Sequence, residues 1–298
     1  SSSSAASDVY KRQSFSFESI RKTLKYMFGM SYIVMVAQLY NRIPKVILGI
    51  VLGPIAVASW AIIEKIKEPL AQLESSLVRP LVPILSEQKY FVAMTSEKVF
   101  QVVRLHYFFM SFLGIVVVTH SDLFISLWLG NNYTDVSVLV KIILLPLLFP
   151  KASVFLMMYY ALGKTKINSI FVTGNTFLSI VIGSTILIFS HDIELFAWSF
   201  SLILIIMSLI TLIQYLKYFD IGLIQYFKNS LISPMLIVAL YYVWKTFLWE
   251  TTNDDLVILL KSLLSSFVIY CVLFIMFMHR EDKSFLWGLF RNLKGRSG

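Results

Sequence analysis

Five polar side chains in one long apolar stretch, residues 55–85, have a spacing that could support chemistry inside a membrane. They follow one another at intervals of four, four, three and four residues: Glu64, Glu68, Gln72, Ser75 and Arg79. Residues three and four apart lie on the same side of a helix, so this spacing predicts one polar helix face. A charge at the centre of a bilayer costs at least about 2.5–3.5 kcal/mol on insertion scales and normally faces a cavity or an opposite charge. The face is therefore a candidate site for a charged ligand or a coupling ion.

Further cations lie beside this face and in neighbouring apolar stretches. Polar residues of the stretch 26–50 fall within an arc of about 100° on a helix: Ser31, Gln38, Asn41, Arg42 and Lys45. Lys65 flanks the polar face, and Lys151 follows Pro150 near the middle of another stretch. The sequence thus predicts a net-cationic cavity at membrane depth, which suits an anionic cargo such as a phosphate-bearing lipid. The predicted substrate-binding cations are Arg42, Lys45, Lys65, Arg79 and Lys151, and the acids predicted to couple an ion or to hold these cations in place are Glu64 and Glu68.

The alternative interpretation is that these charges form ion pairs between helices or extend to the membrane surface. Lys67 and Glu74 are seven residues apart on a neighbouring face of the same helix and can approach as a pair. Arg104 lies near the end of its apolar stretch and is expected to extend to the interface, as are Lys245 and Lys261.

A stripe of small and weakly polar residues lies in the stretch 167–189. Its members are Asn168, Asn175, Thr176, Ser179 and Gly183. Small residues let helices approach closely, so this stripe is predicted to pack against another helix.

The sequence offers no strong catalytic or metal-binding pattern. Cys271 is the single cysteine and the four histidines are scattered, so neither a disulfide framework nor a metal site is expected. A Gly-rich phosphate loop, a Gly-x-Ser-x-Gly elbow and a metal-binding His–Glu pattern are all missing from the sequence. Asp122 and Asp135 lie with Trp128 in the longest predicted outer loop, 120–136, where a solvated turn is favoured over a catalytic pair. We therefore expect a protein that is not an enzyme and that needs no cofactor or metal.

The elements that must position these residues are long apolar helices. Hydrophobic residues make up 57% of the 298 residues and charged residues 14%, where a soluble domain has about a quarter charged. The mean hydropathy is +0.76. A spanning helix needs about 20 mostly apolar residues, and eight stretches meet this requirement: Tyr26–Ile50, Ile55–Leu85, Val99–Thr119, Val136–Leu162, Ile167–Phe189, Ile193–Leu216, Leu231–Leu248 and Leu256–Met278. The predicted fold class is an all-α polytopic membrane protein with about eight transmembrane helices.

The connections between these stretches alternate in charge. One set carries Lys and Arg, such as Lys89 and Lys98, whereas the opposite set carries acids such as Asp192 and no Lys or Arg. Basic loops remain on the cytoplasmic side of a membrane, so both ends of the chain are predicted to be cytoplasmic. The net charge of +9 is therefore assigned to contact with the anionic leaflet and not to nucleic acid.

The first residues, Ser1–Gln13, are set apart from the fold. They resemble translated sequencing-adapter sequence, and the chain does not begin with Met. We expect residues 1–13 to be a non-native segment and the chain to be a fragment.

The stretch 41–86 resembles the seventh and eighth helices of Wzx-type polysaccharide flippases, in the multidrug/oligosaccharidyl-lipid/polysaccharide exporter superfamily. The matching elements are Lys45, Ile47-Leu48-Gly49, Leu52-Gly53-Pro54, Ala56, Ala61, Lys65 and Pro83-Ile84-Leu85-Ser86. A second matching element is the helix end Ala161-Leu162-Gly163-Lys164-Thr165, followed by Asn168. Pro44 stands where many relatives have an acidic residue, so no role for an acid is carried over to that position.

This resemblance implies a fold of about fourteen helices in two six-helix lobes plus two final helices. Residues 14–217 would be the second lobe, 218–278 the final pair and 279–298 a basic cytoplasmic tail. The implied activity moves undecaprenyl-pyrophosphate-linked oligosaccharide to the outer leaflet of the bacterial inner membrane, for surface polysaccharides such as the O-antigen of lipopolysaccharide. The cationic groups would hold the pyrophosphate and acidic sugars while one lobe rocks against the other. The implied partners are the lipid-linked oligosaccharide, membrane lipids and polysaccharide assembly proteins, without nucleic acid.

Two other functions stay open. A multidrug exporter of the same superfamily would need an acidic cavity for cationic drugs, and the basic residues of 26–50 and 55–85 argue against it. A polysaccharide ligase or polymerase would carry catalytic Arg, His or acidic groups in a large outer loop, whereas the predicted outer loops lack Lys and Arg. Dye efflux and the formation of glycosidic bonds would distinguish these alternatives from a flippase.

Overall fold

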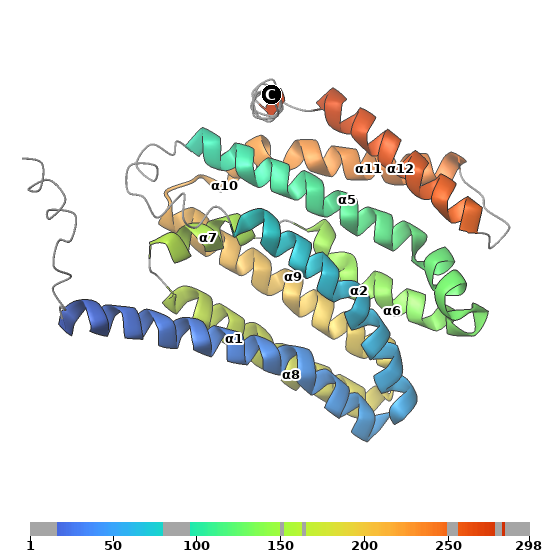
Figure 1. The fold of residues 1–298 in the computed structure, drawn as a ribbon, viewed down its shortest axis with the longest axis horizontal. Helices are drawn as coiled ribbons and strands as arrows, with labels where there is room; N and C mark the ends of the chain where they lie inside the picture. The colour runs from blue at the N-terminus through green and yellow to red at the C-terminus, as the bar shows by residue number, and fades with distance from the viewer. Residues whose placement is uncertain are drawn as a thin grey trace, which may run out of the picture.

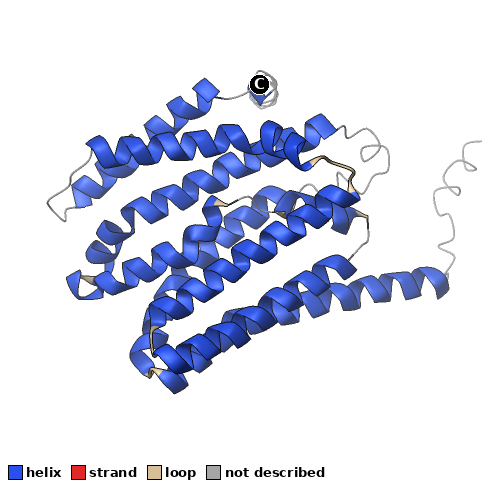
Figure 2. Cartoon of the chain, turned by 180° about the vertical axis from the view of Figure 1, so that it is seen from behind, coloured by secondary structure: helices blue, strands red, loops and turns tan. Residues whose placement is uncertain are grey.

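The computed structural model describes residues 17–79, 96–149, 152–162, 165–248, 256–277 and 282–283. Within these ranges the chain folds into helices and contains no strand (Figure 2). The long helices are α1 (Phe17–Val51), α2 (Pro54–Val78), α5 (Ser96–Leu129), α8 (Lys166–Ser190), α9 (Ile193–Tyr218), α11 (Ile232–Leu248) and α12 (Leu256–Phe277). The shorter elements are η1 (Asn131–Tyr133), α6 (Thr134–Leu144), η2 (Leu145–Leu148), α7 (Ser153–Ala161), α10 (Leu223–Tyr226) and the π-helical turn η3 (Phe227–Leu231).

Seven helical segments in the described ranges are long and apolar enough to cross a membrane. Five lie in α1, α5, α8, α9 and α12, one comprises α6 with its flanking turns, and one runs from α10 into α11. Helix α2 has the length of a span and carries these charged residues: Glu64, Lys65, Lys67, Glu68 and Glu74. The chain is therefore an all-α polytopic membrane protein, as the sequence predicts.

Successive long helices run in opposite directions, so their connections alternate between the two ends of the bundle (Figure 1). Helices α1 and α8 lie side by side along one face, and α9 packs on α8. Helix α6 contacts α2, α5 and α9 in the middle of the bundle, and α11 and α12 cover the far side of α5. The up-and-down course has the geometry that the alternating loop charges predict, and the identity of the cytoplasmic end stays a prediction.

The predicted fourth span, 136–162, is not one continuous helix. Helix α6 passes into the 3₁₀ helix η2, and the backbone becomes extended at Phe149, with φ −99° and ψ 150°, before α7 begins. Pro150 follows Phe149 in the sequence. The residue before a proline is sterically driven out of the helical region, which explains the break.

Helix α5 is longer than its predicted stretch, 99–119, and continues to Leu129. The loop expected at 120–136 is therefore wrong over its first half. Ile125 is fully buried in the main apolar core. The helix continues because its apolar face still packs against neighbouring helices at that depth.

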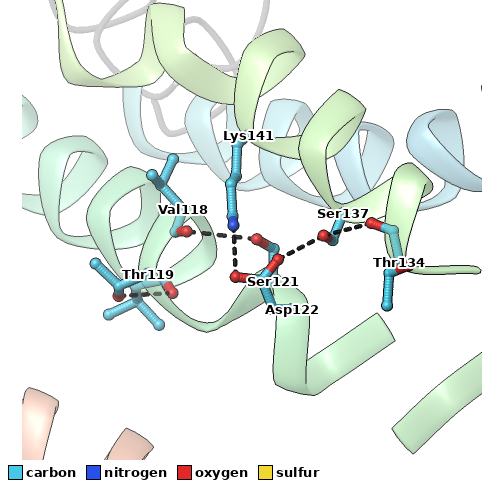
Figure 3. Close-up of polar contacts among 8 residues, drawn as sticks. Val118, Thr119, Ser121, Asp122, Thr134, Ser137 and Lys141 are labelled. Carbon is cyan, nitrogen blue, oxygen red and sulfur yellow. Dashed lines mark hydrogen bonds and ion pairs between the residues drawn. The ribbon is translucent and has the colours of Figure 1, made fainter. Parts of the chain in front are cut away.

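Asp122 is one of the residues that the predicted loop misplaced. Its carboxylate accepts from Lys141 Nζ of α6 at 2.5 Å and from the Ser137 hydroxyl at 2.5 Å (Figure 3). The Asp122 side chain is 62% exposed and the Lys141 side chain 33% exposed. One mostly exposed carboxylate thus joins α5 to the first turns of α6, and it lies on a helix and not in a turn.

A tight hairpin joins α1 to α2. Gly53 has φ +86°, a left-handed conformation in which any side chain would be strained. Pro54 begins α2 at the first helical position, where its missing amide hydrogen costs nothing. The Leu52-Gly53-Pro54 element therefore sets the reversal that brings α1 and α2 together.

The stripe on α8 packs as predicted. Its four polar members, Asn168, Asn175, Thr176 and Ser179, are buried. At Gly183 a methyl group would lie 2.7 Å from Phe200 Cε2 of α9, too close without movement of a neighbour. The missing side chain at this position therefore permits the close approach of α8 and α9.

Arg104 does not extend to the membrane interface as expected. Its side chain is 4% exposed and donates to the two carboxylate oxygens of Asp282 at 2.5 and 2.6 Å. The partner of Arg104 is therefore a buried acid, Asp282, from the segment after α12. Lys261 is exposed, and its extension to the interface stays a prediction.

Several predictions fall outside the residues that the structure describes: the segment 1–13, Lys151, the Lys245 side chain and the tail 279–298 apart from residues 282–283.

Candidate functional site

The described helices surround a cavity of about 240 Å³ between α1, α2, α6, η2 and α9. Aromatic and aliphatic side chains form most of its wall, and the ring centroid of the lining residue Trp60 lies 5.7 Å from that of Phe200, which also lines the cavity. The polar lining residues are Tyr40, Asn41, Glu64, Lys67, Glu74 and Ser201. An apolar hollow with a few polar groups is the usual composition of a ligand site.

An ion pair joins α1 and α2 at this cavity. Lys45 Nζ lies 2.5 Å from Glu64 Oε2. The other carboxylate oxygen, Glu64 Oε1, is buried and has no hydrogen-bond partner within the described residues. Because a buried acceptor without a donor is costly, Glu64 is only half satisfied in this state.

Lys67 supplies the ammonium group that lines the cavity. It follows Glu64 by three residues, so both side chains leave α2 on the same side. Lys67 Nζ donates to Asn41 Oδ1 at 3.4 Å and lies 5.6 Å from the centroid of the Tyr40 ring. Both contacts are long, because 3.4 Å exceeds the usual N–H···O distance and 5.6 Å lies close to the limit of about 6 Å for a cation–π contact.

Glu74 lies two turns further along the same face. Its Oε1 accepts from the Ser153 hydroxyl at 2.5 Å, which links α2 to the start of α7. The pairing of Lys67 with Glu74 that the sequence allowed is not an ion pair in this structure, where Lys67 contacts α1 instead.

The charges at the cavity are balanced within the described chain. One ammonium group, that of Lys67, and two carboxylates, those of Glu64 and Glu74, line the cavity, and Lys45 forms an ion pair with Glu64. The four groups therefore sum to zero.

The structure brings only part of the predicted site together. Glu64 lines the cavity and forms an ion pair with Lys45, which is not itself a lining residue. Four predicted residues are exposed and do not line the cavity: Arg42, Lys65, Glu68 and Arg79. Lys151 lies outside the described residues. The net-cationic cavity predicted from these side chains is therefore not the hollow seen here.

The reason is the rotation of α2. The predicted polar face shares Glu64 with the cavity face, but beyond that residue the two faces diverge. The inward face of α2 carries Trp60, Glu64, Lys67, Ala71 and Glu74. The signal that could have found Lys67 is its seven-residue distance from Trp60, since a large buried aromatic marks the inward side of an amphipathic helix.

The described residues contain no group of three or more His, Cys, Asp or Glu side chains placed to hold a metal ion. The polar atoms at the cavity are those of ammonium, carboxylate, amide and hydroxyl groups. Such groups can bind an anionic or cationic ligand through ion pairs and hydrogen bonds.

Comparison with known proteins identifies a family similarity over the part of the chain that holds this site. No curated protein and no solved structure matches the chain. Residues 3–138 match the sequence profile of a family described as polysaccharide biosynthesis protein. This range covers α1, α2 and α5 and therefore Lys45, Glu64 and Lys67. Over just under half of its length, the chain is similar to polysaccharide biosynthesis proteins.

Proposed function

We propose that this chain acts in the translocation of undecaprenyl-pyrophosphate-linked oligosaccharide across the cytoplasmic membrane of bacteria. The observation that carries the proposal is a cavity packed among membrane-spanning helices and lined by three ionisable groups of α2, Glu64, Lys67 and Glu74, the first of which is paired with Lys45 of α1. Ionisable groups within membrane spans are expensive and mark the pathways of substrates and ions.

The exposed face of α2 supports the same function. Lys65, Glu68 and Arg79 are exposed along a helix whose neighbours are membrane spans. Charged groups do not face lipid hydrocarbon without a large cost, so this face needs water or protein against it. In the proposed function it forms one wall of a hydrated pathway, with the cavity as a recess in that wall.

The comparison supports the type of substrate. The matched profile describes polysaccharide biosynthesis, and transfer of a lipid-linked precursor across the bilayer is one membrane-embedded step of that process. The ammonium groups of Lys45 and Lys67 suit the phosphate groups of such a precursor. Rocking of helix bundles would then expose the recess to each side in turn.

The test is restoration of export. The full-length gene product is expressed in bacteria that lack their own O-unit flippase, and lipid-linked oligosaccharide reaching the outer leaflet is measured. Export is expected with the wild-type protein and is expected to be lost in K67A. The variant K217Q, which changes an exposed lysine at the end of α9, is the matched control and should export normally. Membrane abundance of each variant is measured in the same cells.

A lack of export by wild-type protein that is present in the membrane, with oligosaccharides of several repeat structures, would overturn the proposal. Equal export by K67A and wild type would show that the cavity is not part of the transport pathway.

A second candidate, a multidrug exporter, is favoured by one specific observation. Two carboxylates, Glu64 and Glu74, line the cavity beside Trp60, and acidic groups next to aromatic rings suit cationic amphipathic drugs. Cells expressing the protein would then lower their content of ethidium, a cationic dye, and E74Q would abolish that efflux. Unchanged ethidium content removes this candidate.

A further inference from the structure

We propose that Lys67 is the primary binding residue for a phosphate-bearing headgroup in the cavity, and that Glu64 withholds Lys45 as a second cation until the anion arrives. This inference rests on the proposed function, since it names the chemistry by which the same cavity would recognise its cargo. It also predicts an unusual result: removing a carboxylate from the cavity strengthens anion binding.

Lys67 is available to a ligand because its contacts within the described chain are weak. Its amine forms no ion pair there, and it contacts a neutral amide oxygen of Asn41 at 3.4 Å and the face of Tyr40. An ammonium group has three donors and acts as a compact point charge. Exchange of a 3.4 Å contact for a charge-assisted hydrogen bond to a phosphate oxygen is therefore favourable.

Lys45 differs because its charge is already neutralised. Its amine is held at 2.5 Å by Glu64 Oε2, from a helix that the Gly53 hairpin places alongside. The Lys45 side chain is 34% exposed, so it has room to change its position. An incoming anion must compete with Glu64 for this cation.

Glu64 is poorly suited to keep Lys45 permanently. It is 8% exposed, and Oε1 has no donor among the described residues. A buried pair contributes well to stability only when the remaining lone pairs are also satisfied. The pair is therefore a contact that a better anion can open, and the opened Lys45 would approach the anion from α1 while Lys67 approaches it from α2.

The cavity size limits what can enter. Sites for drug-sized ligands usually measure about 300–1,000 Å³, and this cavity measures about 240 Å³. A phosphate or pyrophosphate group with a neighbouring sugar is therefore the appropriate cargo fragment. Phosphate groups of the lipid carrier and carboxylates of acidic sugars share anionic chemistry, and the experiment distinguishes them.

The test measures binding of farnesyl pyrophosphate to the full-length gene product in lipid nanodiscs by isothermal titration calorimetry. K67Q is expected to weaken binding at least about tenfold, the effect of losing one charge-assisted hydrogen bond, and K67R to restore part of it. E64Q is expected to tighten binding severalfold, and the double variant K45Q/E64Q to lose that gain. K217Q and E97Q, two exposed changes at bundle ends, should bind like wild type.

Competition identifies the source of the anion. Inorganic pyrophosphate should displace the probe, and sodium glucuronate at equal concentration should not. More effective displacement by glucuronate would overturn the assignment of phosphate. No binding by wild type, weaker binding by E64Q, or unchanged binding by folded K67Q would overturn the proposal.

The binding results and the export results separate the two proposals. Export by wild type that persists in K67Q, with no gain of binding in E64Q, would overturn the binding proposal and leave the flippase function standing. The predicted binding pattern without any export by wild type would overturn the flippase function and leave the binding proposal standing.

Discussion

Arg104 and Asp282 form a buried bidentate ion pair across 178 residues of sequence. The guanidinium group donates to both carboxylate oxygens, at 2.5 and 2.6 Å, and also to the backbone carbonyl of Asn229. The Asp282 side chain is fully buried and the Arg104 side chain 4% exposed. One cation of α5 therefore fastens two distant segments, the π-helical turn η3 and the residues that follow α12.

Removal of one partner from this pair is predicted to destabilise the protein strongly. D282A leaves a buried guanidinium without its anion, which typically costs about 3–5 kcal/mol. Unfolding of the purified protein in detergent, followed by helix content, measures the change. K283A, which removes the exposed neighbouring side chain, should change stability very little.

The double variant R104M/D282L tests whether the charges themselves stabilise the fold. It should recover most of the stability lost in D282A, because apolar residues of similar volume often replace a buried pair without cost. Equal stability of D282A and wild type would show that this contact does not hold the C-terminal segment.

Packing of α8 on α9 predicts a second stability effect, at Gly183. A methyl group there would lie 2.7 Å from Phe200 Cε2 and 3.0 Å from Ser199 Oγ, so G183A should destabilise by about 1–3 kcal/mol through overpacking. G174A is the matched control. Its new methyl group would lie 3.1 Å from Met207 Cε, the free end of a flexible side chain, which can move away. Similar thermal unfolding temperatures for the two variants would contradict the close approach of these helices.

A buried hydrogen-bond network between α5, α11 and α12 gives a third prediction. Ser266 Oγ accepts from Tyr241 at 2.6 Å and lies 2.9 Å from His120 Nε2. S266A removes both bonds, and a hydrogen bond between membrane helices contributes about 0.6 kcal/mol on average and at most about 1.7. A loss of stability of roughly 1 kcal/mol is expected in the same unfolding assay.

The matched control for this network is S265A, because in the described part of the chain the Ser265 hydroxyl donates to the Ser262 carbonyl of its own helix and to no other helix. Equal effects of S265A and S266A would show that the network does not join the helices.

The positions of most helices could be predicted from apolar length alone. The predicted stretches 167–189 and 193–216 end within two residues of α8 and α9. The length of α5 could not, because its continuation past residue 119 depends on burial against other helices and on the contact between Asp122 and Lys141. Pro150 indicates a break after η2, but the continuous apolar pattern of 136–162 predicts a single span.

The candidate site could be predicted only in part, because helical spacing does not fix the rotation of a helix. Glu64 and Lys45 stand out as charges in apolar stretches, and in the structure they form an ion pair. Helical spacing places Lys67 on a neighbouring face, and the choice between the polar stripe and the Trp60 face depends on packing against α6 and α9. The partner of Arg104 lies 178 residues away, beyond any local pattern.

The exposed cations on α1 and α2 give the last prediction. Arg42 and Arg79 are exposed and lie outside the cavity, and surface substitutions usually change stability by less than about 0.5 kcal/mol. If they line a hydrated pathway, R42A and R79A should abolish export of lipid-linked oligosaccharide while the amount of protein in the membrane stays normal. K217Q again serves as the control that changes an exposed cation at the end of the bundle. Full export by both alanine variants would exclude these arginines from the pathway, and a fall in membrane abundance would assign them to folding instead.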